Sequence, residues 1–282
     1  MPNNDDSPVK EPPIIQENVD LTPLNTMGVS VKARRFLEIT HRNQLKHLFK
    51  DGFFEREEPI VLGGGSNLLF VEEPERPVLK VSITGMKTTP DSDQHVILKA
   101  GAGENWHKLV TQAVENRLGG IENLALIPGT MGAAPIQNIG AYGVELREVF
   151  TSLTAFNLQT GSFETFDAAA CEFGYRDSVF KRRLRGKVII CDVSMRLTAS
   201  HHNLNLAYSG LSRHLSEKGI ETPSIRDIFD AVVEIRRSKL PDPGDIGNAG
   251  SFFKNPVLER EEFNRLESEY TDVPSYKIAA NE

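Results

Sequence analysis

The sequence predicts an α+β protein, and two patterns carry that prediction. A strand expected at residues 29–33, a helix at 40–52 and a strand at 60–62 form one α/β unit that runs directly into a glycine-rich turn. Farther along, residues 153–166 hold two short strands around a Thr-Gly turn, which indicates an antiparallel hairpin. Because both patterns occur in one chain, α+β is the class that accommodates them.

Periodicity and capping residues predict the remaining elements. Strands are expected at residues 78–83, 95–99 and 189–197. A helix with an apolar stripe begins at Trp106 and is closed by Gly119-Gly120. Another helix follows Ser224, with Asp227 at the capping-box position, and it bears Ile225, Ile228, Phe229, Val232, Ile235 and Arg236.

Composition divides the chain into three segments. Residues 1–20 combine prolines and charges with few apolar anchors, so we expect a flexible lead-in. The predicted elements then follow one another through residues 21–204. The composition shifts after that point, and we expect a second domain at residues 205–282.

Charge and cysteine content limit the function classes. Lys and Arg number 32 against 39 Asp and Glu, and this net charge of −7 argues against general nucleic-acid binding but permits a local basic pocket for an anion. Cys171 and Cys191 have no metal-ligand spacing, so we expect buried thiols, no metal site and a reducing compartment. Without a long apolar run or a signal-peptide pattern, the expected location is the cytoplasm, with no membrane partner.

Residues 124–143 are unusually rich in glycine and alanine and nearly free of charge. Gly and Pro oppose a helix here, while the apolar content is unsuited to a solvated loop. Two interpretations remain open: a buried packing segment, or backbone that passes close to a flat or phosphorylated ligand with its N–H groups pointing toward it.

Common nucleotide motifs fail. Gly101-Ala102-Gly103 begins a dinucleotide pattern, but its third glycine position is Trp106, so a Rossmann site is not expected. No phosphate-loop motif occurs.

His201-His202 has no spaced third ligand and is expected in a solvated loop. The cations Arg236, Arg237 and Lys239 suit either a solvated helix end or a diphosphate.

Five motifs in order resemble one enzyme family. They are Gly63-Gly64-Gly65-Ser66-Asn67, residues 128–143, Tyr175-Arg176-Asp177-Ser178, Lys239-Leu240-Pro241-Asp242-Pro243 and Gly250-Ser251-Phe252-Phe253-Lys254-Asn255-Pro256. Each motif alone is weak, but all five stand in the order found in the UDP-N-acetylenolpyruvoylglucosamine reductase (MurB) family, over residues ~21–280. The chain therefore resembles that family.

The resemblance implies a fold and a reaction. Residues 21–204 would form a vanillyl-alcohol-oxidase-like (PCMH-type) FAD-binding domain of two α/β subdomains, and residues 205–282 part of a substrate-binding α+β domain. The implied reaction uses FAD and NADPH to reduce UDP-N-acetylenolpyruvoylglucosamine to UDP-N-acetylmuramate for peptidoglycan. Hydride passes from flavin N5 to the enolpyruvyl group. The implied partners are the UDP-sugar and NADPH, and the chain would be a monomer.

The resemblance also implies residue roles. FAD would be bound by Gly63, Gly64, Gly65, Ser66, Asn67, Pro128, Gly129, Thr130, Gly132, Ala133, Gln137, Asn138, Gly140, Ala141, Tyr142 and Gly143. Arg176 would meet the substrate carboxylate, and Ser251 would donate a proton to carbon. Substrate would be bound by Tyr208, Lys239, Asn255 and Tyr276. An ion pair with Asp177 is the alternative for Arg176, and a turn or helix cap the alternative for Ser251.

The family pattern continues beyond the segment that residues 277–280 resemble. The resemblance places a catalytic glutamate in that continuation, so the substrate-binding domain is expected to be incomplete here. Two alternatives follow. One is an inactive FAD- or UDP-sugar-binding fragment, and the other is a flavin oxidoreductase of the same FAD-domain class with a different substrate.

Overall fold

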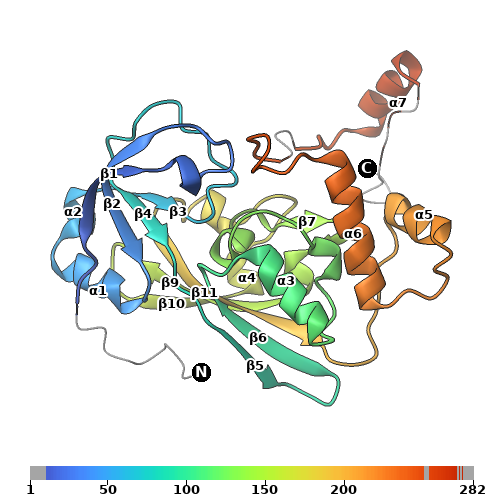
Figure 1. Cartoon of the computed structure of the whole chain (residues 1–282), viewed down its shortest axis with the longest axis horizontal. Coiled ribbons are helices and arrows are strands. Elements are labelled where there is room, and N and C mark those ends of the chain that lie inside the picture. Colours follow the sequence, from blue (N-terminus) through green and yellow to red (C-terminus); the bar gives the residue numbers. More distant parts are fainter. Residues whose placement is uncertain (1–10, 251–253, 272, 274, 276–282) are drawn as a thin grey trace. The chain divides into compact units, whose positions relative to one another are not determined.

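The computed structural model describes residues 11–250, 254–271, 273 and 275. Its contacts divide the chain into two compact units, Met1–Gly250 and Ser251–Glu282, and each is described by itself. The first unit contains two large sheets, which Figure 1 shows with the helices around them.

A four-stranded sheet has the strand order β1-β2-β4-β3. Its strands are β1 (Ile15–Asp20), β2 (Lys32–Ile39), β4 (Val78–Val81) and β3 (Ile60–Leu62). β2, β4 and β3 are parallel, and the chain passes from β2 to β3 through α1 (Asn43–Lys50) and α2 (Phe53–Arg56), which confirms the expected α/β unit. Residues 63–67 therefore leave the carboxyl end of a parallel strand.

Residues 15–20, expected in a flexible lead-in, instead form β1. This strand pairs antiparallel with β2, from Ile15↔Leu37 to Asp20↔Lys32. Because nearly all its side chains are exposed, hydrophobic periodicity gives no sign of it. Backbone hydrogen bonds to β2 hold the strand, so the lead-in expectation is wrong for these residues.

The strand expected from residue 29 begins only at Lys32. The buried Asn25 side-chain amide donates hydrogen bonds to the carbonyl oxygens of Leu21 (2.8 Å) and Val29 (3.1 Å), and its oxygen accepts one from the Val29 N–H (3.0 Å). These bonds close a turn before the strand. Apolar alternation alone does not reveal a turn stabilised by a polar side chain.

A five-stranded antiparallel sheet has the order β10-β9-β11-β6-β5. Its strands are β10 (Phe163–Asp167), β9 (Phe150–Asn157), β11 (Val188–Thr198), β6 (His95–Gly101) and β5 (Met86–Pro90). The β9–β10 pairing confirms the expected hairpin. β5 is absent from the sequence-based prediction because all its side chains are exposed.

One hydrophobic core joins the two sheets. From α1, the Phe49 ring contacts Phe156 of β9 edge-to-face, with ring centroids 6.2 Å apart. α3 (Trp106–Glu115) lies above β6 and β11 in Figure 1 and buries the predicted apolar stripe, including Trp106 and Leu109. Both cysteines are free and buried, as expected.

α5 (Ser209–Glu217) and α6 (Ile225–Lys239) pack on the same core. The Ser224 side chain accepts a hydrogen bond from the Asp227 N–H and the Asp227 carboxylate accepts one from the Ser224 N–H, which confirms the predicted capping box. Buried residues such as Leu211 and Ile228 join the core of the preceding sheets. The boundary expected at residue 205 is therefore not a break in packing.

Shorter elements complete the described structure. In the first unit they are α4 (Ala168–Cys171), the two-stranded β7 (Gly140–Ala141) and β8 (Val144–Glu145), and the 3₁₀ turns η1 (Thr22–Leu24), η2 (Glu122–Leu124), η3 (Met131–Gln137), η4 (Leu146–Glu148) and η5 (Val179–Lys181).

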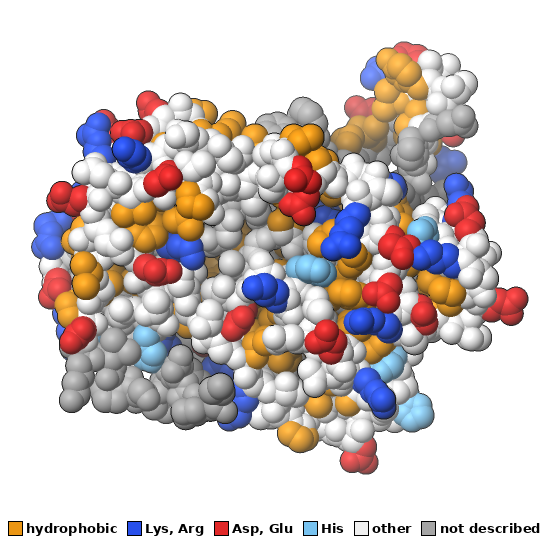
Figure 2. Space-filling view, viewed as in Figure 1, with side chains coloured by type: hydrophobic (Ala, Val, Ile, Leu, Met, Phe, Trp, Pro, Cys, Tyr) orange, Lys and Arg blue, Asp and Glu red, His pale blue; other side chains and the backbone are white. Residues whose placement is uncertain are grey.

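The second unit contains α7 (Arg260–Glu269), which buries none of its described residues. On the face shown in Figure 2, acidic and basic side chains are interspersed. In the described ranges no helix has the length and apolar character that a membrane span requires.

Candidate functional site

Two glycine-rich loops meet in the first unit. A Cβ at Gly64 would lie 3.0 Å from the Gly129 Cα, and a Cβ at Gly63 would lie 2.6 Å from the Thr130 Oγ1. Gly65 has φ +62°, and a Cβ there would lie 2.0 Å from the Leu24 carbonyl oxygen. Glycine is therefore required where these loops approach each other and the N-terminal turn.

The backbone N–H groups of residues 63–67 have no hydrogen-bond acceptor among the described residues. The carbonyl oxygen of Gly65 is fixed by the Thr26 N–H, 3.1 Å away. A run of available amides in a fixed loop is a donor set that suits an anion such as a diphosphate.

A cavity of about 270 Å³ lies between these loops. Nine of the predicted cofactor residues line it: Gly63, Gly64, Gly65, Ser66, Asn67, Pro128, Thr130, Ala133 and Gln137. The Asn67 Nδ2 lies 3.4 Å from the Gln137 Oε1 across the two segments. Trp106 and Lys181 also line the cavity but were not predicted, because neither belongs to a glycine-rich motif.

Other predicted cofactor residues stabilise the loop instead of lining this cavity. A Cβ at Gly132 would lie 2.6 Å from the Ala102 Cβ. Asn138 is fully buried at φ +43°, donates to the Glu145 carboxylate (3.1 Å) and the Gly174 carbonyl (3.0 Å), and accepts from the Arg147 N–H (3.0 Å). Packing therefore accounts for this part of the segment, while the part that lines the cavity is available to a ligand.

The β7–β8 hairpin carries the remaining predicted cofactor residues, Gly140, Ala141, Tyr142 and Gly143. Tyr142 is at φ +48°, and its carbonyl accepts a hydrogen bond from Asn123 Nδ2 at 3.0 Å. Its ring meets that of Tyr208 edge-to-face, with centroids 5.1 Å apart. A predicted cofactor residue and a predicted substrate residue are thus in contact.

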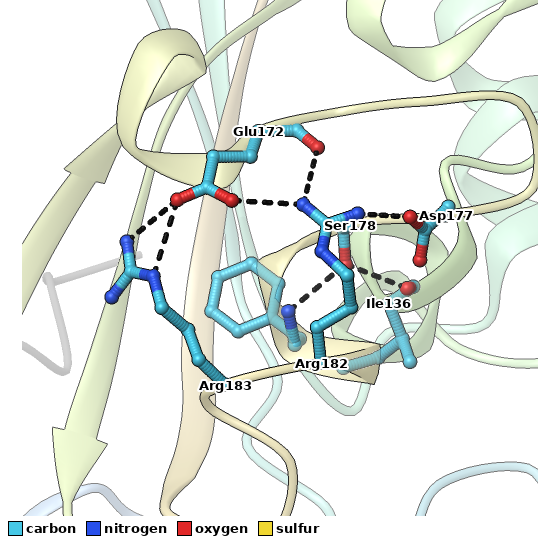
Figure 3. A network of polar contacts seen from close by, with 7 residues as sticks. Ile136, Glu172, Asp177, Ser178, Arg182 and Arg183 are labelled. Carbon is cyan, nitrogen blue, oxygen red and sulfur yellow. Dashed lines mark hydrogen bonds and ion pairs between the residues drawn. The ribbon is translucent and has the colours of Figure 1, made fainter.

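Arg176 reaches the same hairpin. Its Nη2 donates to the Gly140 carbonyl oxygen at 2.5 Å, and a Cβ at Gly140 would lie 3.2 Å from the Arg176 Nη1. Figure 3 shows that Asp177 pairs with Arg182, which also contacts Glu172. The alternative of an Arg176–Asp177 ion pair is therefore wrong, and the guanidinium is directed to the hairpin.

The loop that carries Arg176 is held at several points. Glu172 accepts from both Arg182 (2.8 Å) and Arg183 (2.8 Å), and the Ser178 Oγ donates to the Ile136 carbonyl oxygen at 2.7 Å (Figure 3). The Lys181 Nζ donates to the Arg176 carbonyl oxygen at 3.1 Å. This network ties the loop to η3, the segment that lines the cavity.

Arg236, in the last turn of α6, lies in the same region. Its Nε is buried and has no hydrogen-bond partner in the described structure. Burial lowers the pKa of Arg236, and the nearby Arg176 charge lowers it further, while Tyr142 opposes the shift. Burial also raises the pKa of the Tyr142 phenol. Arg237 and Lys239 are exposed, which both open interpretations allow, whereas a solvated helix end does not describe the half-buried Arg236.

Three predicted residues belong to the second unit, which is described by itself. Ser251 and Tyr276 lie outside the described residues, and Asn255 is exposed in the second unit. Lys239 is the exposed last residue of α6. His202 Nδ1 lies 2.6 Å from the Thr198 Oγ1, and the described part of the chain has no cluster of metal-ligating side chains.

Relatives establish the family. Residues 34–167 match a family model described as an FAD binding domain. A UDP-N-acetylenolpyruvoylglucosamine reductase of Flavobacterium johnsoniae is 38% identical over 268 residues, covering 95% of this chain and 79% of the relative. Its counterpart from Burkholderia multivorans is 48% identical over 254 residues, covering 89% of this chain and 72% of the relative. This chain belongs to the UDP-N-acetylenolpyruvoylglucosamine reductase family.

A solved structure shows the same fold. The UDP-N-acetylenolpyruvylglucosamine reductase (MurB) of Thermus caldophilus matches with a TM-score of 0.61 at 24% identity, covering 90% of this chain and 80% of that one. The chain thus has the α+β architecture with a PCMH-type FAD-binding domain that the motifs led us to expect, and its cofactor is FAD.

The cavity residues fit FAD. Glycines 63–65 present amides without protein acceptors, which suit the diphosphate of a dinucleotide. Trp106, Ile127, Ile136 and Ile139 supply apolar walls that suit a flat ring system. These residues are those that would hold the cofactor in this reductase family.

Proposed function

We propose that this chain reduces UDP-N-acetylenolpyruvoylglucosamine to UDP-N-acetylmuramate, with FAD as cofactor and NADPH as reductant, for peptidoglycan synthesis. The observation that carries the proposal is the position of Arg176. The guanidinium of this residue is held against the Gly140 carbonyl, at the end of the glycine-rich segment whose first half lines the cofactor cavity. The identity of the proposed substrate comes from the names of the relatives, which are UDP-N-acetylenolpyruvoylglucosamine reductases.

The reaction defines what the protein must supply. Bound FAD, once reduced by NADPH, would supply a hydride from N5 to the methylene carbon of the enol ether and return to its oxidised form. Negative charge then develops at the carbon that bears the carboxylate. Arg176 stabilises that charge, because a guanidinium presents parallel N–H donors to a carboxylate. Its partial burial strengthens the interaction relative to water.

The remaining roles are proposed for residues that match the family motifs. Ser251 protonates the substrate carbon, which is basic enough to accept a proton from a hydroxyl. Lys239 and Asn255 bind the diphosphate, and Tyr208 and Tyr276 contact the substrate. The exposed, flexible ammonium of Lys239 suits a diphosphate as a point charge.

Location and oligomeric state are also part of the proposal. Burial raises the pKa of both Cys171 and Cys191 to about 12, which keeps the thiols protonated and unreactive. Buried free thiols suit a reducing compartment, and we propose a cytoplasmic monomer.

The test is turnover by the purified chain. The expected result is a yellow protein that consumes NADPH only when the enolpyruvyl substrate is present and releases UDP-N-acetylmuramate, identified by mass spectrometry. A colourless protein would contradict the FAD site. Substrate binding without product would identify a binding module, and turnover that does not need Lys239 would indicate a different substrate.

A further inference from the structure

A second cavity in the first unit is separate from the cofactor cavity. Its volume is about 390 Å³, and no described residue lines both cavities. Its walls come from the turn around η2, from β8 and η4, and from the chain between Asn203 and Ala207. A cavity of this size is within the range of small-molecule sites, and neither the family motifs nor the proposed function accounts for it.

The wall of this cavity includes a carboxylate that the fold buries without a cation. Only 2% of Glu122 is exposed, and its Oε2 accepts a hydrogen bond from the Gly120 N–H at 2.6 Å. Among the described residues, its Oε1 has no donor and the carboxylate forms no ion pair. The Oε1 is not among the sealed polar atoms that lack a partner, so it is open to the cavity that Glu122 lines. A buried carboxylate with one neutral donor is costly unless a further partner binds it.

Two more side chains present acceptors to the same cavity. Asn123, only 1% exposed, donates from its Nδ2 to the carbonyl oxygens of Tyr142 (3.0 Å) and Asn205 (2.9 Å), which leaves its Oδ1 without a donor in the described structure. The Glu148 Oε1 accepts from the Glu145 N–H at 2.6 Å, and its Oε2 likewise has no donor there. None of the described residues that line the cavity is a lysine or arginine. The polar wall therefore offers oxygen acceptors and negative charge without a cation of its own.

The remaining wall is largely aliphatic and consists of Val144, Val149, Leu204 and Leu206. Acceptors beside aliphatic side chains suit a ligand that has a cationic donor group on a hydrocarbon chain. An alkylammonium ion has three N–H donors and no acceptor. A divalent metal ion is less suited, because the described part of the chain contains no group of three metal-ligating side chains. We propose that this cavity binds a small aliphatic amine in its ammonium form, with Glu122 as the counter-ion.

The amine site adjoins the hairpin of β7 and β8. Asn123 binds the Tyr142 carbonyl oxygen, and the Asn205 Nδ2 donates to the Gly143 carbonyl oxygen at 3.0 Å. These acceptors are brought together by segments far apart in sequence, so the site exists only in the folded chain. An amine that binds there stabilises the folded chain by mass action.

The first experiment compares two cations of equal charge. Butylammonium chloride supplies N–H donors, whereas tetramethylammonium chloride supplies none, and the flavin-loaded chain is unfolded by heat in each salt at equal concentration. We expect the unfolding temperature to rise with butylammonium concentration until it saturates, and tetramethylammonium to produce no such rise. Equal effects of the two salts would indicate charge screening alone, and no effect of either would leave only water in the cavity. Both results would overturn the amine site.

Glu122→Gln removes the counter-ion but keeps an oxygen that can accept from the Gly120 N–H. In a calorimetric titration, the affinity for butylammonium should fall roughly 10- to 100-fold, the usual worth of a charge-assisted hydrogen bond. Glu217→Gln, at the exposed end of α5, is the control and should bind butylammonium as the unsubstituted chain does. Unchanged affinity in Glu122→Gln would overturn the role of this carboxylate.

A second variant keeps the test decisive if Glu122→Gln fails to fold. Ala207 is exposed and lines the cavity, so Ala207→Leu adds bulk to the cavity while both carboxylates remain. This variant should fold and lose butylammonium binding. Binding that survives in Ala207→Leu would place the amine elsewhere on the protein and overturn the site. Because none of these measurements involves turnover, failure of the proposed reductase activity would not affect their outcome.

Discussion

The direction of the Arg176 side chain depends on an unusual backbone conformation of its loop. Arg176 has φ +54°, a conformation that is rare for a residue other than glycine, and the surrounding ion pairs of Arg182 and Arg183 hold the loop in place. Its motif predicts a functional arginine. The sequence does not predict that Arg176 forms no ion pair with its neighbour Asp177. In the structure the Asp177 carboxylate pairs with Arg182 instead.

Arg176→Lys tests the role of the guanidinium. A lysine keeps the positive charge but has a single nitrogen. The guanidinium of Arg176 can bind a carboxylate through one nitrogen while its Nη2 donates to the Gly140 carbonyl oxygen, and a lysine cannot do both. We expect the reoxidation of reduced flavin by substrate to slow by about 10²-fold, with flavin reduction by NADPH unchanged. Arg213→Lys, at an exposed position of α5, is the control. Equal slowing of both half-reactions in Arg176→Lys would contradict the assignment.

His107 makes stability depend on pH. Burial lowers its pKa, and the charges of Arg237 and Arg236 lower it further, while its Nδ1 accepts a hydrogen bond from the Leu126 N–H at 3.0 Å. The neutral ring is therefore the folded form. Since the unfolded chain takes up a proton first, this contribution is present above the unfolded pKa of about 6.5 and is lost as pH falls toward the lower folded value.

The corresponding variant is His107→Gln, which keeps an acceptor for Leu126 but does not titrate. Between pH 7.5 and pH 5.5, the unfolding temperature of the unsubstituted chain should fall more than that of the variant. Parallel declines in a calorimetric comparison would show that His107 is not a source of the pH dependence.

At the scale of elements, the glycine loops were predictable because close backbone approach leaves a sequence signature. Gly63, Gly64 and Gly65 stand together; Gly64 and Gly65 are needed where the loop passes other backbone, and Gly63 where the loop meets the Thr130 side chain. The second half of the 128–143 segment shows the limit of that signature. Gly132 and Asn138 belong to the same motif but serve packing and hydrogen bonding, which composition cannot distinguish from ligand contact.

Gly65→Ala tests the need for this close approach. The new methyl group would meet the Leu24 carbonyl oxygen at 2.0 Å, so the loop must move and the chain should lose bound FAD. Gly28→Ala is the matched control, because Gly28 has a similar φ of +65° but open space around the added Cβ. We expect it to cost about 1 kcal/mol in unfolding free energy and to retain the flavin. Comparable flavin loss in both variants would show that backbone strain alone explains the effect.

The capping box of α6 offers a second test at this scale. Ser224→Ala removes the hydroxyl that accepts from the Asp227 N–H at 3.3 Å and should cost about 1 kcal/mol in urea unfolding. Glu221→Ala, at an exposed position before the helix, is the control and should have little effect. If the two substitutions proved equally mild, the cap would not stabilise the helix that carries Arg236.

At the scale of the whole molecule, helix and strand periods predicted the main strands, the hairpin, the helix that begins at Trp106 and the helix that Ser224 caps. They could not predict that α5 and α6 share one core with the flavin-binding part, since such packing joins residues far apart in sequence. The same holds for Lys181 and Arg236 at the site. Their positions follow from tertiary packing, and the sequence left Arg236 open between a solvated helix end and a diphosphate site.

Trp106 reports on this shared core, because it is the one tryptophan in the sequence and lies buried in α3. Ile228→Ala in α6 leaves a cavity in the same cluster and should lower the stability followed by Trp106 fluorescence by roughly 2–4 kcal/mol. An unchanged Trp106 transition, with α6 unfolding separately, would show instead that residues 205–250 form an independent domain.

The most direct test of the central claim follows the flavin itself. The chain is reduced by NADPH without oxygen and then mixed with UDP-N-acetylenolpyruvoylglucosamine while visible absorbance is recorded. We expect the substrate to reoxidise the flavin, rapidly in the unsubstituted chain and more slowly in Arg176→Lys. Reduced flavin that stays reduced in the presence of saturating substrate would contradict it.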